Sequence, residues 1–161
     1  MAGARSHEEI IAWQLAYELK TRVYELIRTG PIIRDFELSD QLRRAASSAP
    51  RLIAEGFGRY LPGDFSRYLR AANGELKETY DALRDGVDRG HFAQDDIVPL
   101  QRLSKRASKA ATSLIAYLRS AEAPNEGRRP RPRGSNSPQR SKEPKEPKEP
   151  KEPPELPEQD P

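Results

Sequence analysis

The chain has 161 residues, no cysteine and a formal net charge of +3. Its length suits one domain, and the lack of cysteine excludes disulfides, thiolate nucleophiles and cysteine-ligated metals. No apolar run is long enough to span a membrane, and the N-terminus lacks the apolar segment of a secretion signal, so a cytoplasmic protein is expected.

The first predicted helix covers about residues 7–29 and ends at Gly30-Pro31. At about 100° per residue its apolar side chains fall on two arcs. A surface helix of a monomer needs only one apolar stripe, so this helix is expected to be central in the fold or to pack against a second subunit. One arc holds Ile10, Trp13, Tyr17, Tyr24 and Ile27, and the other holds the predicted oligomer-interface residues Ile11, Leu15, Leu19 and Leu26.

The second and third predicted helices cover about residues 37–59 and 64–89. Asp64 is expected to be the N-cap of the third helix, and Gly90 is expected to follow its C-terminus. The apolar seam of the third helix advances in steps of four and three residues, which is typical of bundle packing. This seam consists of Phe65, Leu69, Ala72, Leu76, Tyr80, Leu83 and Val87.

The fourth predicted helix covers about residues 95–120 and has its own apolar seam, from Leu100 to Leu118. No alternating strand pattern occurs in the sequence. Four helices with short connections predict an all-α, up-and-down four-helix bundle over residues 1–120.

Residues 121–161 lack this periodicity and include four Lys-Glu-Pro repeats over residues 142–153. Nine basic and nine acidic residues balance each other in this tail. Such a composition predicts a disordered chain that serves as a solubilising spacer or as a proline-rich docking segment.

The sequence offers little catalytic chemistry. Its two histidines are His7, near a terminus, and His91, in a predicted turn, and no glycine-rich phosphate loop is present. Glu55 and Glu78 either face each other as a carboxylate pair or each bind a nearby basic residue. We therefore predict no catalytic residue, no cofactor, no metal site and no small-molecule substrate.

The fourth predicted helix carries a basic stripe opposite its apolar seam, with no acidic residue between Ile97 and Ala121. A stripe of this kind can neutralise phosphates of RNA or DNA. The alternative is an ordinary solvated face, stabilised by positive charge near a helix C-terminus. The candidate residues are Arg102, Lys105, Arg106 and Lys109.

Residues 41–59 (QLRRAASSAPRLIAEGFGR) and 65–78 (FSRYLRAANGELKE) resemble the 23S rRNA intervening-sequence proteins. The resemblance extends over about residues 8–119. The chain departs from the family pattern at Leu52, Glu75 and Thr79, where that pattern has Asn, Ser and an apolar residue. The residues that match the family motif are Arg44, Glu55, Gly56, Arg59 and Glu78.

This resemblance implies a left-handed bundle from a bacterial genome, assembled into a pentameric ring, and it transfers no catalytic role. We interpret these motif residues as stabilising the structure rather than taking part in catalysis. Gly56 permits close helix approach, and the charged residues tie helix ends or subunits together. The leading hypothesis is a non-enzymatic homo-oligomer that binds nucleic acid or a nucleic-acid-handling partner. The alternative is a protein-only scaffold.

Overall fold

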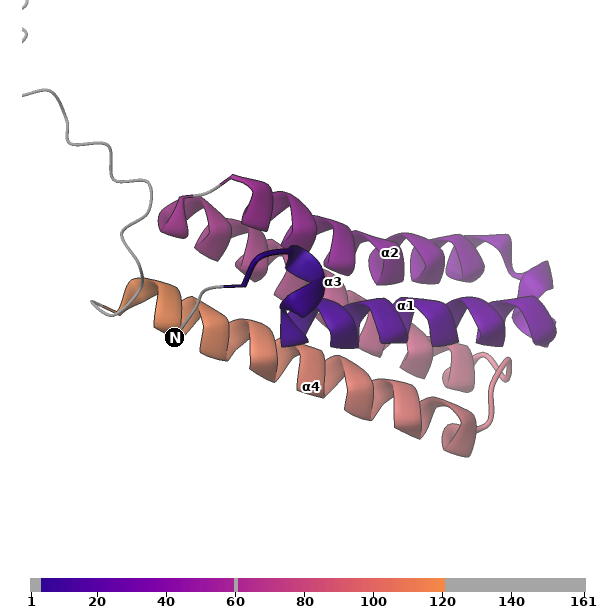
Figure 1. Cartoon of the computed structure of the whole chain (residues 1–161). Coiled ribbons are helices and arrows are strands. Elements are labelled where there is room, and N and C mark those ends of the chain that lie inside the picture. Colours follow the sequence, from indigo (N-terminus) through magenta and orange to yellow (C-terminus); the bar gives the residue numbers. More distant parts are fainter. Residues whose placement is uncertain (1–3, 60, 121–161) are drawn as a thin grey trace, which may run out of the picture. The chain divides into compact units, whose positions relative to one another are not determined.

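The structure is a computed structural model that describes residues 4–59 and 61–120 (Figure 1). Within these residues the chain is all-α and contains no strand. The tail predicted over residues 121–161, with its Lys-Glu-Pro repeats, lies outside the described residues.

Four long helices and two short 3₁₀ helices make up the described chain. The long helices are α1 (Ile11–Thr29), α2 (Phe36–Gly58), α3 (Pro62–Asp88) and α4 (Gln94–Arg119). The 3₁₀ helices are η1 (His7–Glu9), before α1, and η2 (Pro31–Arg34), between α1 and α2. The four predicted helices are therefore confirmed, but the first one begins later than predicted, because Ile10 is extended and separates η1 from α1.

Local chemistry explains where the helices begin and end. Asp35 caps α2, since its Oδ1 accepts the Leu38 amide at 3.1 Å. The prediction that Asp64 caps the third helix is wrong. That helix begins at Pro62, because proline at the first position has no amide hydrogen to leave unpaired. Gly90 follows α3 with a φ of +77°, as predicted for a helix-terminating glycine.

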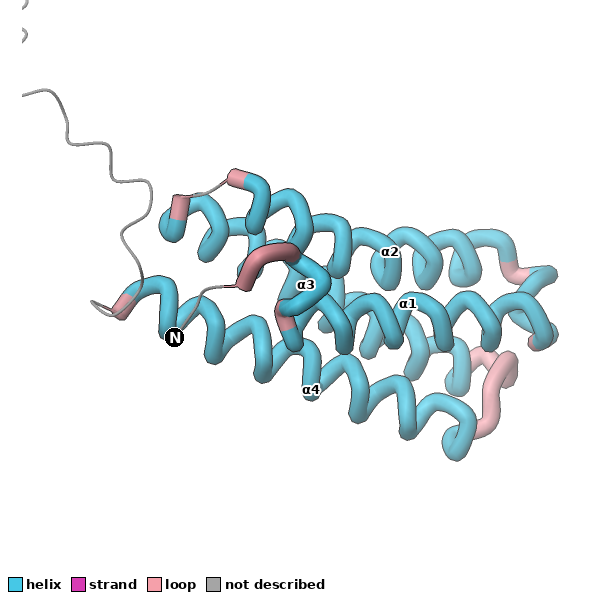
Figure 2. The backbone as a smooth tube through the Cα atoms, viewed as in Figure 1, coloured by secondary structure: helices cyan, strands magenta, loops and turns pink. Residues whose placement is uncertain are grey.

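Each helix packs against its neighbours in the chain, and α4 returns to pack against α1. Figures 1 and 2 show that the axes of the four helices are roughly aligned and that short connections join successive helices. This arrangement confirms the predicted up-and-down four-helix bundle for the described residues.

The core stripe of α1 differs from both predicted arcs. It runs between them and takes Leu19 from one and Ile27 from the other, with Ala12, Ala16 and Val23 completing it. Two alanines on this stripe let the neighbouring helices approach closely, so the core needs fewer large residues from α1 than the two arcs contain.

The predicted seam of α3 is correct except at Tyr80 and Val87, which are only half-buried. Thr79 is fully buried in the core instead. Its hydroxyl donates to the Glu75 carbonyl at 2.8 Å, so the polar atom is hydrogen-bonded despite its burial. None of the described helices is both long and apolar enough to cross a membrane.

Candidate nucleic-acid interface

The outer face of α4 carries the four basic residues predicted from the sequence. Arg102, Lys105, Arg106 and Lys109 are all exposed, because Leu103, Ala107 and Ala111 turn the opposite face of the helix into the core. None of the four forms an ion pair with another described residue. Their charges are therefore available to an external anion.

Polar contacts hold α4 in register on α3. The buried Ser104 hydroxyl donates to the Leu76 carbonyl at 2.7 Å. Further along the same contact, the Asn73 amide donates to the Thr112 hydroxyl at 3.3 Å. These contacts fix which side chains of α4 face solvent.

The basic face extends from α4 towards α3. The Lys105 ammonium lies 5.0 Å from the centroid of the Tyr80 ring, a cation–π contact. Lys77 and Arg84 lie three residues before and four residues after Tyr80, and both are exposed. At about 100° per residue they share the α4-facing side of α3 with Tyr80. We did not predict this extension, although the spacing of Lys77, Tyr80 and Arg84 is visible in the sequence.

The family-motif residues lie elsewhere and do not form one cluster. Near the end of α2, Glu55 Oε1 accepts hydrogen bonds from Arg59 Nη2 at 2.9 Å and from the Tyr68 hydroxyl at 2.8 Å. These two donors lower the pKa of Glu55, and the hydrogen bond to Glu55 raises the pKa of Tyr68. Arg44 pairs with Asp40 at 2.7 Å on the outside of the same helix.

Glu55 and Glu78 do not form the carboxylate pair considered above. Glu78 Oε1 accepts Gln41 Nε2 at 3.4 Å, which places it against the first half of α2. Gln41 and Glu55 are separated by about 21 Å along the helix axis at about 1.5 Å per residue. The alternative that each binds a basic residue fits Glu55 but not Glu78, whose described partner is an amide.

Gly56 lies at a close contact between α2 and α3. It is buried, and a Cβ atom there would lie 2.5 Å from the Tyr68 Cβ and 2.8 Å from the Phe65 Cδ2. No side chain fits this position without a shift of α3. Gly56 therefore acts through packing.

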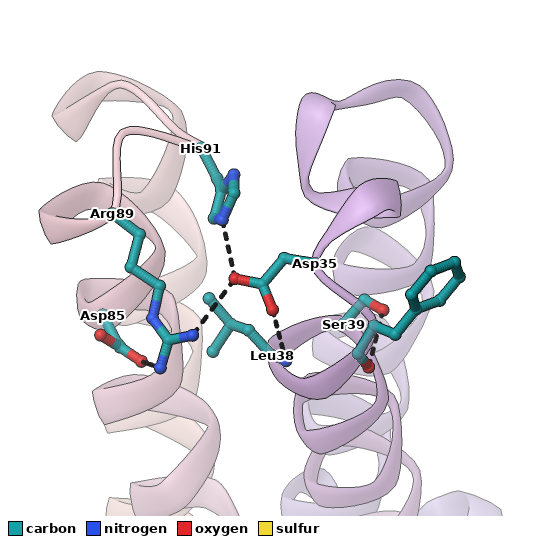
Figure 3. Close-up of polar contacts among 7 residues, drawn as sticks. Asp35, Leu38, Ser39, Asp85, Arg89 and His91 are labelled. Carbon is teal, nitrogen blue, oxygen red and sulfur yellow. Dashed lines mark hydrogen bonds and ion pairs between the residues drawn. The ribbon is translucent and has the colours of Figure 1, made fainter.

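His91 has a polar partner that the sequence did not indicate. Its Nε2 lies 2.9 Å from Asp35 Oδ2, and Arg89 Nη1 lies 3.2 Å from the same oxygen (Figure 3). The Leu38 amide is the main cause of the lowered pKa of Asp35, followed by His91 and, more weakly, Arg89. The cluster joins the α1–α2 connection to the α3–α4 connection. Among the described residues no group of three or more acidic or histidine side chains is placed to hold a metal ion.

The predicted interface residues of α1 separate into two sets. Leu19 is fully buried in the core of the single chain, so its assignment to an outer surface is wrong. Ile11 is 64% exposed, whereas Leu15 and Leu26 are half-buried against the core. Ile11 is therefore the most accessible of the four.

A sequence model of the family described as 23S rRNA-intervening sequence protein matches residues 8–113. The match runs from η1 into α4 and includes both segments that carry the resemblance. No curated protein matches the chain.

Proposed function

Because this chain belongs to the 23S rRNA-intervening sequence protein family, we propose that it is a non-enzymatic, self-associating helical protein that binds RNA or DNA. The binding surface is the basic face of α4, formed by Arg102, Lys105, Arg106 and Lys109. We propose that this binding takes place in the bacterial cytoplasm.

One observation carries the proposal: four neighbouring cations on one helix are exposed and unpaired within the described chain. By contrast, three other exposed arginines, Arg22, Arg44 and Arg67, are each paired with an acidic residue on the same helix. The four cations span about 10 Å of helix axis. That length suits several consecutive phosphates, and each phosphate neutralised releases counterions.

The geometry favours contact with the phosphate backbone over base-specific readout. Tyr117 is the only large hydrophobic residue of α4 that is exposed among the described residues, and it lies two turns beyond Lys109. Backbone contacts carry no sequence information. The proposed binding is accordingly tolerant of sequence.

The test replaces all four residues of the face by glutamine and measures binding of a fluorescent RNA by anisotropy. We expect the affinity to fall by about 100-fold or more near physiological salt. The matched control replaces Arg22, Arg34, Arg44 and Arg67 by glutamine, which removes the same charge from other exposed positions. This control should weaken binding by less than about tenfold.

The second candidate function is a protein-only scaffold. Under that alternative, the wild-type chain binds neither RNA nor DNA in a salt-dependent manner, and the two quadruple variants behave alike. Equal losses in both variants would also show that α4 is not the binding surface.

A further inference from the structure

A second surface, separate from the basic face of α4, lies between α1 and α2. It is a groove of about 510 Å³. Its walls come from the second half of α1, from η2 and from the first half of α2. Its lining includes Lys20, Tyr24, Glu25, Arg28, Ile33 and Arg43.

The groove exposes large apolar side chains. Tyr24 is 41% exposed and Ile33 is 50% exposed. Phe36 does not line the groove, but it follows Ile33 by three residues at the first position of α2 and is 78% exposed. Exposed apolar residues that gather in one place mark surfaces that protein partners bury. Apolar side chains do not stabilise bound phosphates. This surface is therefore suited to a protein partner, unlike the basic face of α4.

The charges around the groove are mostly positive. Lys20, Arg28 and Arg43 face one acidic residue, Glu25. The Lys20 ammonium lies 4.3 Å from the centroid of the Tyr17 ring and 6.0 Å from that of Tyr24, so it lies along an aromatic wall. None of the three cations forms an ion pair with a described residue. The complementary ligand is apolar and acidic.

The groove does not overlap the proposed self-association surface. Tyr24 and Leu15 are nine residues apart, which places them on opposite sides of α1 at about 100° per residue. Ile11 likewise lies about 140° from Tyr24 around the helix. A ligand in the groove and a second subunit on the Ile11 side therefore use different sides of α1.

We propose that this groove binds an acidic amphipathic helix of a partner protein. Apolar side chains of that helix pack on Tyr24 and Ile33, and its carboxylates pair with Lys20, Arg28 and Arg43. Docking of an amphipathic helix between two helices is a recurring mode of peptide recognition. The chain then has one surface for nucleic acid and another for protein.

The test uses the full chain and a fluorescent helical peptide of about 18 residues, with leucines on one face and glutamates on the others. We expect saturable binding that shifts the amide resonances of Thr21, Tyr24, Ile33 and Arg43 and leaves those of Arg102 to Lys109 unchanged. A matched peptide with serine in place of each leucine should bind at least about tenfold more weakly, because it keeps only the charge.

Variants then locate the site. Tyr24→Ala combined with Ile33→Ser, and separately Arg28→Glu combined with Arg43→Glu, should each weaken peptide binding by at least about tenfold. Ile11→Ser is the control, since it removes another exposed apolar residue from the opposite side of α1, and it should change the affinity by less than about twofold. Circular dichroism checks that every variant remains helical.

Three results would overturn this proposal. The first is a failure of the peptide to bind, or equal binding by all variants. The second is a single-stranded RNA that shifts the same groove amides, which would assign the groove to nucleic acid. The third is an oligomer that dissociates in the variant with Tyr24→Ala and Ile33→Ser but not in the other variants. That result would assign the groove to a second copy of the chain.

Discussion

At the scale of single residues, backbone and side-chain contacts at the two ends of the bundle decide which substitutions are tolerated. Gly56 permits α3 to approach α2, while the Glu55, Arg59 and Tyr68 side chains bond to one another beside it. At the other end, Asp35 caps α2 and also binds His91 across the bundle. Each feature predicts a measurable effect on stability.

Gly56→Ala should lower the free energy of unfolding by about 1–3 kcal/mol, because the added methyl group collides with Tyr68 and Phe65. Gly74→Ala is the matched control, since no neighbouring atom lies within 4 Å of a Cβ there. That variant should be more stable than the wild type by about 0.5–1 kcal/mol, since alanine favours an exposed helix interior. Urea denaturation measures both. A Gly56→Ala variant as stable as Gly74→Ala would show that the α2–α3 contact is looser than the structure indicates.

The lowered pKa of Asp35 predicts how stability depends on pH. The folded-state pKa lies below the ordinary value of 3.8. Ionised Asp35 therefore stabilises the fold above that value, and this contribution is lost as the pH falls through the folded-state pKa. Asp35→Asn keeps a capping side chain but removes the charge, so it should be less stable than the wild type at neutral pH.

This difference in stability should shrink as the pH is lowered from neutral to below the ordinary value of 3.8, because the wild-type carboxylate becomes protonated there. Thermal unfolding across this pH range is the measurement. Asp81→Asn is the control, because exposed Asp81 forms no ion pair with a described residue, and its curve should stay parallel to that of the wild type. If the difference in stability between the wild type and Asp35→Asn stayed constant with pH, the charged contacts of Asp35 would not be the cause of that difference.

At the scale of helices, the contact of α4 with α3 and α1 determines where the basic face points. The small residues Ala107 and Ala111 are fully buried, and Ser104 hydrogen-bonds to α3. Small residues at these positions keep α4 close to the core. The basic residues are consequently held on the opposite side of the helix.

Ala111→Leu should destabilise the bundle by about 1–3 kcal/mol, because the larger side chain does not fit this packed position. Ala116→Leu on the exposed face of the same helix is the control and should change stability by less than about 0.5 kcal/mol. Calorimetry or urea denaturation distinguishes them. Equal stability of the two variants would contradict the orientation of α4.

At the scale of the whole molecule, helical periodicity was sufficient to predict the four helices, their order and the exposure of the basic stripe. It failed for α1, because the alanines that contact the core do not stand out in a pattern of large apolar residues. It also failed for the Asp35 and His91 contact, since those residues are 56 positions apart and meet only when two connections fold to the same end. The extension of the basic face to Lys77 and Arg84 depends on how α3 and α4 are aligned. Residue spacing within one helix does not determine that alignment.

Self-association is a property of the whole molecule and has its own test. Sedimentation velocity of the wild type at micromolar concentration should show a species heavier than the 18.2 kDa chain. Ile11→Asp should shift the protein towards the monomer, because it places a charge on the proposed contact. Phe36→Asp alters a more exposed apolar residue at the first position of α2 and should leave the assembly intact. A monomeric wild type contradicts the proposed assembly.

The central claim is that the basic face of α4 binds nucleic-acid phosphates, and the salt dependence of RNA binding tests it most directly. The logarithm of the binding constant is measured against the logarithm of salt concentration for the wild type and for the variant with glutamine at Arg102, Lys105, Arg106 and Lys109. Each lost phosphate contact should reduce the steepness of this plot by about 0.7–0.9, so loss of four contacts should reduce it by about 2.8–3.6. An unchanged slope would contradict the account.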